Sequence, residues 1–437
     1  MSDENGPTGS RRGYARRIAL ASVAVTALLL GMLLLVERRH EIPRDPEPPG
    51  KLAPRNETAR AHGVGQPDLS PLPQSIAGML ARSADHFGSL EVCGLGQIKV
   101  DRSDAFGVAK VLSALSRKAQ ARWISTLVDS DDPRARAVGL AMQATPVFAG
   151  ADGDGASAEQ ARDALVQLAV GAADPAIYSI AVNLCNSYDD PSPSASCQHI
   201  SLREWARIDS DNAVPWLVIA GKARAANDAA AAAAALGRAG AAKRVDSYNS
   251  SLLGYSQPEM PPDATPTEQY LLAASLIGNE AAWATPQYSV ATTLCSVEAV
   301  SDDRVRQNCD ALAELLVSRG TALVDLSIGA AIGSRVGWPS ARLRQLSQER
   351  DALMQVMMQP MAPYNAEPWD CDQVRVGNEL LKQIARLGEL GTARDALERS
   401  GETVEELAQR QAEFMEKIRT EAQQQRARDE GEASSAP

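Results

Sequence analysis

The stretch YSIAVNLC, residues 178–185, returns as YSVATTLC at residues 288–295, 110 positions further along (288 − 178). Both copies follow the pattern Tyr-Ser-[Ile/Val]-Ala-x-x-Leu-Cys. After each copy come an acidic pair and a second cysteine, in the order Cys185, Asp189-Asp190, Cys197 and Cys295, Asp302-Asp303, Cys309. This agreement exceeds what composition alone produces, so we infer two related helical hairpins in one body. Self-similar helix pairs are typical of a stacked α-solenoid.

The sequence around the duplication predicts helices almost everywhere. Residues 104–127 carry apolar side chains at helical spacing. Asp132-Pro133 and Asp174-Pro175 each predict a helix start, because an acidic cap is followed by proline in the first turn. Residues 228–242 are nearly pure alanine, the strongest helix former. Alternation with period 2 is scarce, so we expect no strands and predict an all-α fold.

A further pattern lies in residues 209–242. Its first helix opens at Asp211-Asn212-Ala213, a turn follows at Asn227-Asp228, and the apolar positions of the two helices are Trp216, Ile219, Ala220, Ala232, Leu236 and Ala239. This segment resembles a tetratricopeptide unit. The resemblance covers one helix pair and implies a tetratricopeptide-like body rather than membership of the strict family. Such proteins typically bind other proteins or peptides on a concave face, which makes an irregular tetratricopeptide-like α-solenoid the expected architecture.

The N-terminal region contains an apolar run over residues 18–36. A helix of that length reaches roughly 30 Å, the thickness of the hydrocarbon core of a bilayer. Arginines precede it at positions 11, 12, 16 and 17, and the run lacks the small-residue cleavage site of a signal peptide. We therefore predict an uncleaved transmembrane anchor, with residues 1–17 in the cytoplasm. The alternative is a buried core helix, which the charged flanks and the missing polar face disfavour.

The rest of the chain divides into three predicted parts. Residues 37–74 are rich in proline and predict an extended stalk. Residues 75–401 form the helical repeat domain. Residues 402–437 are predicted as a charged helix with pairs at i, i+4, Glu406 with Arg410 and Glu413 with Lys417, and with a frayed end.

The chain contains six cysteines, for which fifteen connectivities are possible. The duplication selects one of them. It favours a bridge across each hairpin, Cys185 with Cys197 and Cys295 with Cys309, and leaves Cys93 and Cys371 as the third pair. Persistent bridges need an oxidising compartment, so this pairing predicts a body in the bacterial periplasm. The alternative is six free thiols in a cytoplasmic body.

Motifs that carry chemistry are scarce. The net charge of −11 argues against nucleic-acid binding. There is no C-x-x-C, no G-x-S-x-G and no phosphate-binding G-x-x-x-x-G-K-[ST]. His199 is expected on the surface, and the acidic turn at residues 152–155 lacks the first and last ligands of a calcium loop. We predict no catalytic, cofactor-binding or metal-binding residues and no cofactor.

These observations lead to a functional hypothesis. We expect a protein of the bacterial inner membrane that crosses it once, with its N-terminus in the cytoplasm and its body in the periplasm. It would serve as a scaffold that binds an envelope protein or peptide and has no catalytic activity. Two alternatives remain: an enzyme or accessory factor of the cell wall whose site is assembled from distant residues, and a periplasmic sensor.

Overall fold

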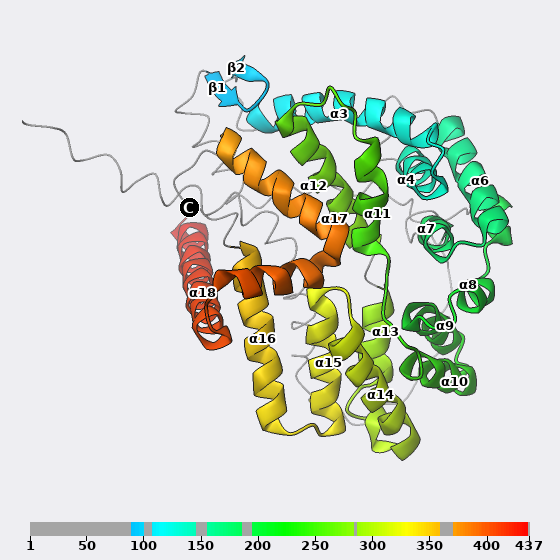
Figure 1. Ribbon diagram of the computed structural model, residues 1–437. Coiled ribbons are helices and arrows are strands. Elements are labelled where there is room, and N and C mark those ends of the chain that lie inside the picture. The colour runs from blue at the N-terminus through cyan, green and yellow to red at the C-terminus, as the bar shows by residue number, and fades with distance from the viewer. Residues whose placement is uncertain are drawn as a thin grey trace, which may run out of the picture. The chain divides into compact units, whose positions relative to one another are not determined.

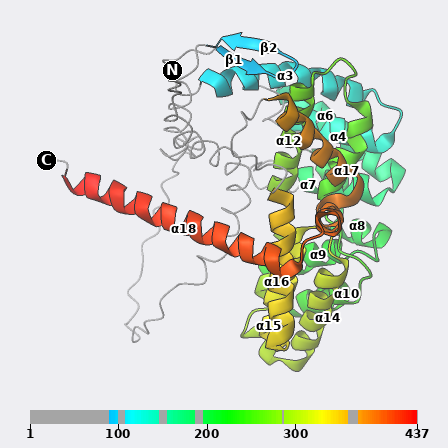
Figure 2. The ribbon, with the colours of Figure 1, turned by 60° about the vertical axis from the view of Figure 1, so that its left-hand side comes forward.

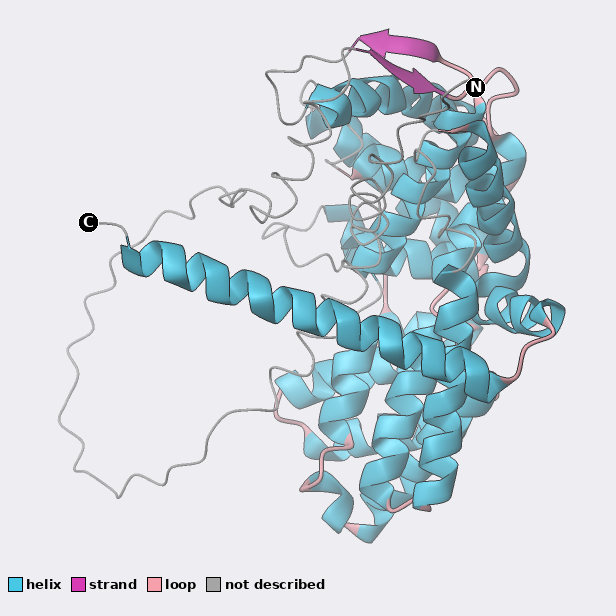
Figure 3. Cartoon of the chain, turned by 90° about the vertical axis from the view of Figure 1, so that its left-hand side faces the viewer, coloured by secondary structure: helices cyan, strands magenta, loops and turns pink. Residues whose placement is uncertain are grey.

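The computed structural model describes residues 89–99, 107–145, 155–185, 195–283, 286–358 and 370–435. In these ranges the chain forms fifteen α-helices, three short 3-10 helices and two strands (Figure 3). Contacts divide the chain into two compact units, which are described separately. Unit 1 comprises Met1–Val92, Gly96–Leu112 and Ala362–Asp370, and unit 2 comprises Cys93–Leu95, Ser113–Met361 and Cys371–Pro437.

The described part of unit 1 contains an antiparallel hairpin of β1 (Ser89–Val92) and β2 (Gly96–Lys99). Ser89 pairs with Lys99, and Val92 pairs with Gly96. Gly96 has a φ of +70°, a backbone conformation that glycine adopts at little cost. The expectation of no strands is therefore wrong at this point. Each strand has four residues, which is too short for period-2 alternation to stand out from the surrounding sequence.

Unit 2 is helical in its described part (Figure 1). Its α-helices, of which α3 begins in unit 1, are α3 (Gly107–Val128), α4 (Pro133–Ala144), α6 (Gly155–Ala172), α7 (Pro175–Cys185), α8 (Leu202–Ile208), α9 (Ala213–Ala225), α10 (Ala229–Gly240), α11 (Asn249–Ser256), α12 (Pro266–Trp283), α13 (Pro286–Leu294), α14 (Asp303–Arg319), α15 (Leu323–Val336), α16 (Ser340–Met358), α17 (Cys371–Ser400) and α18 (Val404–Ser435). The 3-10 helices are η1 (Ala195–His199), η2 (Gln257–Glu259) and η3 (Ala299–Ser301).

The predicted helix starts are confirmed. Asp132 caps α4, where its carboxylate accepts a hydrogen bond from the backbone N–H of Arg134 at 2.9 Å. Asp174 precedes α7 and accepts from two N–H groups of the first turn, and it also pairs with the Arg134 side chain at 2.8 Å. Asp228 caps the alanine-rich α10. These caps satisfy backbone donors that have no partner inside the helix.

Helices that follow one another in the chain also pack together, as α4 with α6, α6 with α7, α9 with α10, and α14 with α15. One main hydrophobic core runs through these pairs and includes Trp123, Tyr178 and Trp205, which are all at most 2% exposed. The segment that resembles a tetratricopeptide unit folds as the helix pair α9–α10. The tetratricopeptide-like assignment itself stays a prediction.

A polar cluster fastens the turn between α8 and α9 to the chain that follows α10. The Arg244 guanidinium donates to Asp209 at 2.5 Å, to the Tyr248 hydroxyl at 2.6 Å and to Asp246 at 2.9 Å. The Tyr248 hydroxyl donates in turn to Asp209 at 3.0 Å, and the Asn212 amide donates to the same carboxylate at 2.8 Å. Asp209 is only 4% exposed, so these bonds replace the water that its charge would otherwise need.

The predicted charged helix near the C-terminus is present as α18, and the helix before it has a break that was not predicted. α17 is broken at Gly388, where φ is +72°, and α18 begins at Val404 and packs against α16 (Figure 2). The first turn of α18 forms a capping box in which Thr403 and Glu406 exchange hydrogen bonds. Arg410 then pairs with Glu402, and the Glu413 carboxylate accepts from Gln409. The hydrogen bonds from Thr403 lower the pKa of the Glu406 carboxyl, and the charge of Arg410 lowers it further, in keeping with the predicted Glu406–Arg410 pair.

The predicted fold class needs a second correction, which concerns the membrane. Across the described ranges, no helix combines the length and the apolar character that crossing a bilayer requires. The predicted anchor at residues 18–36 and the stalk at residues 37–74 lie outside the described residues.

Candidate functional site

All six cysteines are paired in the structure. Cys185 bonds to Cys197, Cys295 to Cys309, and Cys93 to Cys371, which are the pairs that the duplicated pattern selects. The first two bridges span 12 and 14 positions, whereas the third spans 278. Three disulfides in one chain indicate an oxidising, extracytoplasmic location.

The two copies of the duplicated motif use their tyrosines differently. Both tyrosines lie in the first half of a helix, Tyr178 in α7 and Tyr288 in α13. The Tyr178 hydroxyl accepts a hydrogen bond from the backbone N–H of Ser201, which is the N-cap residue of α8. The Tyr288 hydroxyl donates to the carboxylate of Asp325 in α15 at 2.9 Å. Each copy therefore forms a helix that ends near a disulfide, but the tyrosine hydroxyls of the two copies bond to different partners.

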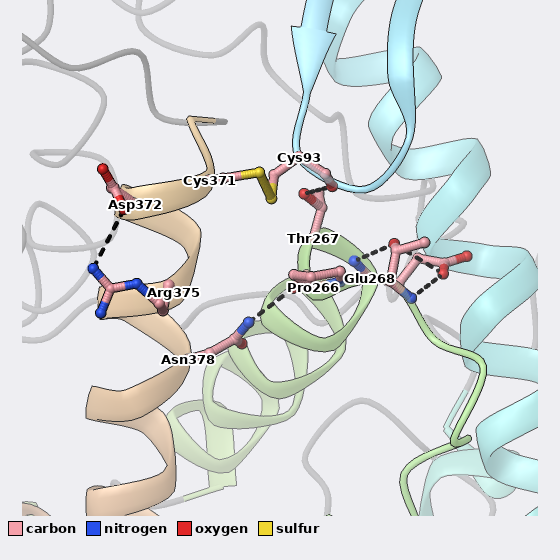
Figure 4. The surroundings of a disulfide bond; sticks show 9 residues. Cys93, Pro266, Thr267, Glu268, Cys371, Asp372, Arg375 and Asn378 are labelled. Carbon is pink, nitrogen blue, oxygen red and sulfur yellow. Dashed lines mark hydrogen bonds and ion pairs between the residues drawn. A yellow bond between two sulfur atoms is a disulfide. The ribbon is translucent and has the colours of Figure 1, made fainter.

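The third disulfide joins Cys93, in the turn between β1 and β2, to the first turn of α17 (Figure 4). Cys371 is the first residue of α17. Cys93 is held at the start of α12, because its carbonyl accepts from the Thr267 hydroxyl at 2.7 Å. Gly94 follows with a φ of +75°, and a Cβ added there would lie 2.8 Å from Pro266 Cδ. Only glycine allows the chain to approach α12 this closely in that conformation.

Two further contacts hold α12 and α17 together. The Asn378 side chain donates to the Pro266 carbonyl at 2.9 Å (Figure 4). A Cβ on Gly377 would lie 2.6 Å from Tyr270 Cε2, so glycine is needed for the two helices to meet here. The hydrogen bond and the glycine contact join the two helices directly, and the disulfide adds an indirect link through Cys93 and Thr267.

A pocket opens beside this junction. Apolar side chains form much of its wall, and the polar lining consists of amides and one ammonium group: the lining residues are Met260, Pro261, Pro262, Ala273, Leu381, Gln257, Gln269, Asn378 and Lys382. The cavity volume is about 160 Å³. Pockets that hold whole small molecules or cofactors measure roughly 300–1,000 Å³. This pocket is therefore smaller than those that hold a whole small molecule.

The polar groups of the pocket are held in place by the surrounding chain. The Gln269 amide donates to the carbonyl of Ala264 at 3.0 Å, and the Lys382 ammonium pairs with Glu379 at 2.8 Å on the same face of α17. Lys382 is the one charged residue in the lining. Side-chain amides can bond to both the N–H and the C=O of a peptide, and the ammonium favours a carboxylate nearby.

A buried acidic cluster lies elsewhere in unit 2, where the break in α17 meets the start of α15. The Asp325 carboxylate accepts from the backbone N–H groups of Thr321 and Ala322 at 2.8 and 2.9 Å, and from the Tyr288 hydroxyl. Glu389 follows the break and accepts from the N–H of Leu323 at 3.1 Å. Burial raises the pKa of the Glu389 carboxyl and that of the Asp325 carboxyl, and it raises the pKa of Tyr288 well above its usual range.

The acidic cluster was not anticipated from the sequence. Asp325 and Glu389 are 64 positions apart (389 − 325), and each looks like an ordinary charge on a helix surface. A signal was present in Gly388 and Gly391, because two glycines so close together are unfavourable inside a helix and mark a break.

We expect Glu389→Gln to flatten the dependence of stability on pH. A buried carboxyl with a raised pKa stabilises the fold at low pH, where it is protonated, and this contribution is lost as pH rises through the folded-state pKa. Glutamine keeps an acceptor for the Leu323 N–H and carries no charge. As the pH rises from 4.5 to 7.5, the free energy of unfolding measured by chemical denaturation should fall less in the variant than in the parent protein.

Glu398→Gln provides the control for this measurement. Glu398 is an exposed residue on the same helix, so its replacement should leave the pH profile of the parent protein unchanged. Parallel profiles for the parent and Glu389→Gln would contradict the assignment of the buried charge to Glu389.

Other residues considered from the sequence occupy ordinary positions. His199 is exposed at the end of η1, and Trp205 is a core residue at 2% exposure. Trp216 is half-buried beneath the Arg238 guanidinium, 4.9 Å from its ring centre. The acidic turn at residues 152–154 lies outside the described ranges. In the part of the chain that the structure describes, no group of three or more His, Cys, Asp or Glu side chains is placed to hold a metal ion.

Comparisons with protein-family models, with curated proteins and with solved structures find no match to this chain.

Proposed function

We propose that the protein is a non-catalytic helical scaffold of the bacterial periplasm, built from tetratricopeptide-like helix pairs, that binds a partner protein through an extended segment. The observation that carries the proposal is the small pocket lined in part by α12 and α17.

The pocket also indicates the chemistry of the partner. Its apolar wall, with Met260, Pro261 and Leu381, accepts an aliphatic side chain. The amides of Gln257 and Gln269 can bond to the peptide backbone on either side of that residue. Lys382 favours an acidic residue next to it. The expected ligand is therefore an extended segment with a leucine-like side chain followed by Asp or Glu.

Peptide binding to the full chain tests the proposal. A panel of fluorescent peptides would vary the apolar residue and the charge that follows it, and polarisation would be measured at fixed ionic strength. Peptides with the Leu-Asp or Leu-Glu order should bind with dissociation constants on the order of 10–100 µM, and Lys382→Glu should weaken binding at least tenfold. The parent protein should lose affinity by a similar factor for a peptide in which lysine replaces the acidic residue.

Arg386→Glu is the matched control, because it reverses a charge one turn further along α17 and lies outside the pocket lining. It should bind the peptides like the parent. The proposal fails if no peptide shows saturable binding, or if Lys382→Glu and Arg386→Glu weaken binding equally.

A further inference from the structure

The three disulfides differ in exposure to solvent. Cys295 and Cys309 are both 0% exposed. Cys185 and Cys197 are half-buried, and Cys185 is the last residue of α7. Cys371 is the one exposed cysteine of the six, whereas its partner Cys93 is 8% exposed. A reductant can therefore reach Cys371 of the third bridge while the core stays closed. To reach the bridge between Cys295 and Cys309, the core would first have to open.

Helix position adds to this difference. Cys371 begins α17, and the positive end of a helix dipole favours a thiolate. The charges of Asp370 and Asp372, on either side of Cys371, oppose this effect, and Asp372 is paired with Arg375 at 3.3 Å (Figure 4). Cys185 occupies the opposite end of its helix, where the dipole disfavours a thiolate. Exposure and helix polarity thus single out the same bridge.

We propose that the Cys93–Cys371 disulfide is a site of thiol–disulfide exchange with a dithiol reductant, and that its reduction loosens the pocket between α12 and α17. This inference rests in part on the proposed function, because it adds regulation to the same pocket. Cys93 is fastened to α12 through Thr267, so the bridge ties the first turn of α17 to the first turn of α12. After reduction, Asn378 and the Gly377–Tyr270 contact are left to hold the two helices at this end.

The exchange proceeds in two balanced steps. One thiolate of the dithiol attacks Sγ of Cys371, the bond to Sγ of Cys93 breaks, and Cys93 leaves as a thiolate that takes up a proton. The second thiol of the reductant, after losing its proton, attacks the sulfur of the mixed disulfide that belongs to the reductant and releases the Cys371 thiolate, which is protonated in turn or remains a thiolate. The protein bridge gains two electrons, and the dithiol is oxidised to a disulfide.

Timed reduction of the folded full chain with dithiothreitol tests the site. Free thiols would be trapped with an alkylating reagent and assigned by peptide mass spectrometry. Cys93 and Cys371 should be labelled at least tenfold faster than Cys295 and Cys309, and faster than Cys185 and Cys197. Equal rates for the three bridges, or earlier labelling of either other pair, would overturn the assignment.

Hydrogen exchange of the same samples tests the effect on the pocket. Selective reduction should speed amide exchange at least fivefold in residues 266–273 and 371–382 and leave residues 303–336 unchanged. The double variant Cys93→Ser/Cys371→Ser should reproduce this pattern without reductant, whereas Cys185→Ser/Cys197→Ser should not. Unchanged exchange after selective reduction would disprove the loosening. These readouts need no peptide, so a failure of peptide binding refutes the proposed function alone.

Discussion

Replacement of Trp123 by alanine is expected to lower the free energy of unfolding by about 3–5 kcal/mol. Trp123 is fully buried in the main core, and its indole N–H donates to the carbonyl of Ser256 at 3.2 Å, which joins α3 to the end of α11. Alanine removes nearly all of the side chain, leaves a cavity and takes away the hydrogen bond to the Ser256 carbonyl. Urea denaturation followed by circular dichroism measures the effect, because the helical signal is lost on unfolding.

Two variants separate the contributions. Trp123→Phe keeps most of the apolar volume but loses the hydrogen bond to Ser256, so it should cost about 1–3 kcal/mol. Val170→Ala removes two methyl groups from a side chain that is 54% exposed, and it should change stability by less than about 0.5 kcal/mol. A cost for Trp123→Ala no larger than that for Val170→Ala would show that α3 does not belong to the core.

Replacement of Arg244 by alanine is expected to cost about 3 kcal/mol. The guanidinium lies between Asp209, Asp246 and Tyr248, and Asp209 is nearly inaccessible to water. Removal of the arginine leaves the Asp209 charge buried with only the Tyr248 hydroxyl and an amide as donors. We place the effect at the low end of the range for buried pairs, because the arginine side chain itself is 37% exposed.

The neighbouring residue supplies the control. Lys243 pairs with Asp211 at 2.9 Å, but both side chains are mostly exposed, so Lys243→Ala should cost less than about 1 kcal/mol. Adding Asp209→Asn to Arg244→Ala should recover about 1 kcal/mol, because the uncompensated charge disappears. Equal costs for Arg244→Ala and Lys243→Ala would mean that the cluster does not hold the turn between α8 and α9.

Much of the helical architecture was accessible from the sequence because its determinants are local. An Asp before a helix bonds to N–H groups two or three residues away, so Asp132 and Asp174 mark helix starts by themselves. The bridges within the duplicated segments follow for the same reason, since each closes a short stretch of chain. The hairpin β1–β2 was missed, because its strands are too short to show a pattern.

The sequence by itself determined a largely helical protein with three disulfides, which indicate an oxidising location, and with a duplicated eight-residue motif. The tertiary structure alone decided where its polar groups are buried and where a partner can bind. Trp123 meets Ser256, Glu389 meets the start of α15, and Gln269 lines one pocket with Lys382, across separations of 133, 66 and 113 positions (382 − 269 for the last). The physical reason is that helical periodicity specifies which face of a helix is buried, whereas the neighbour of that face depends on close-packed contacts such as that of Gly377 with Tyr270.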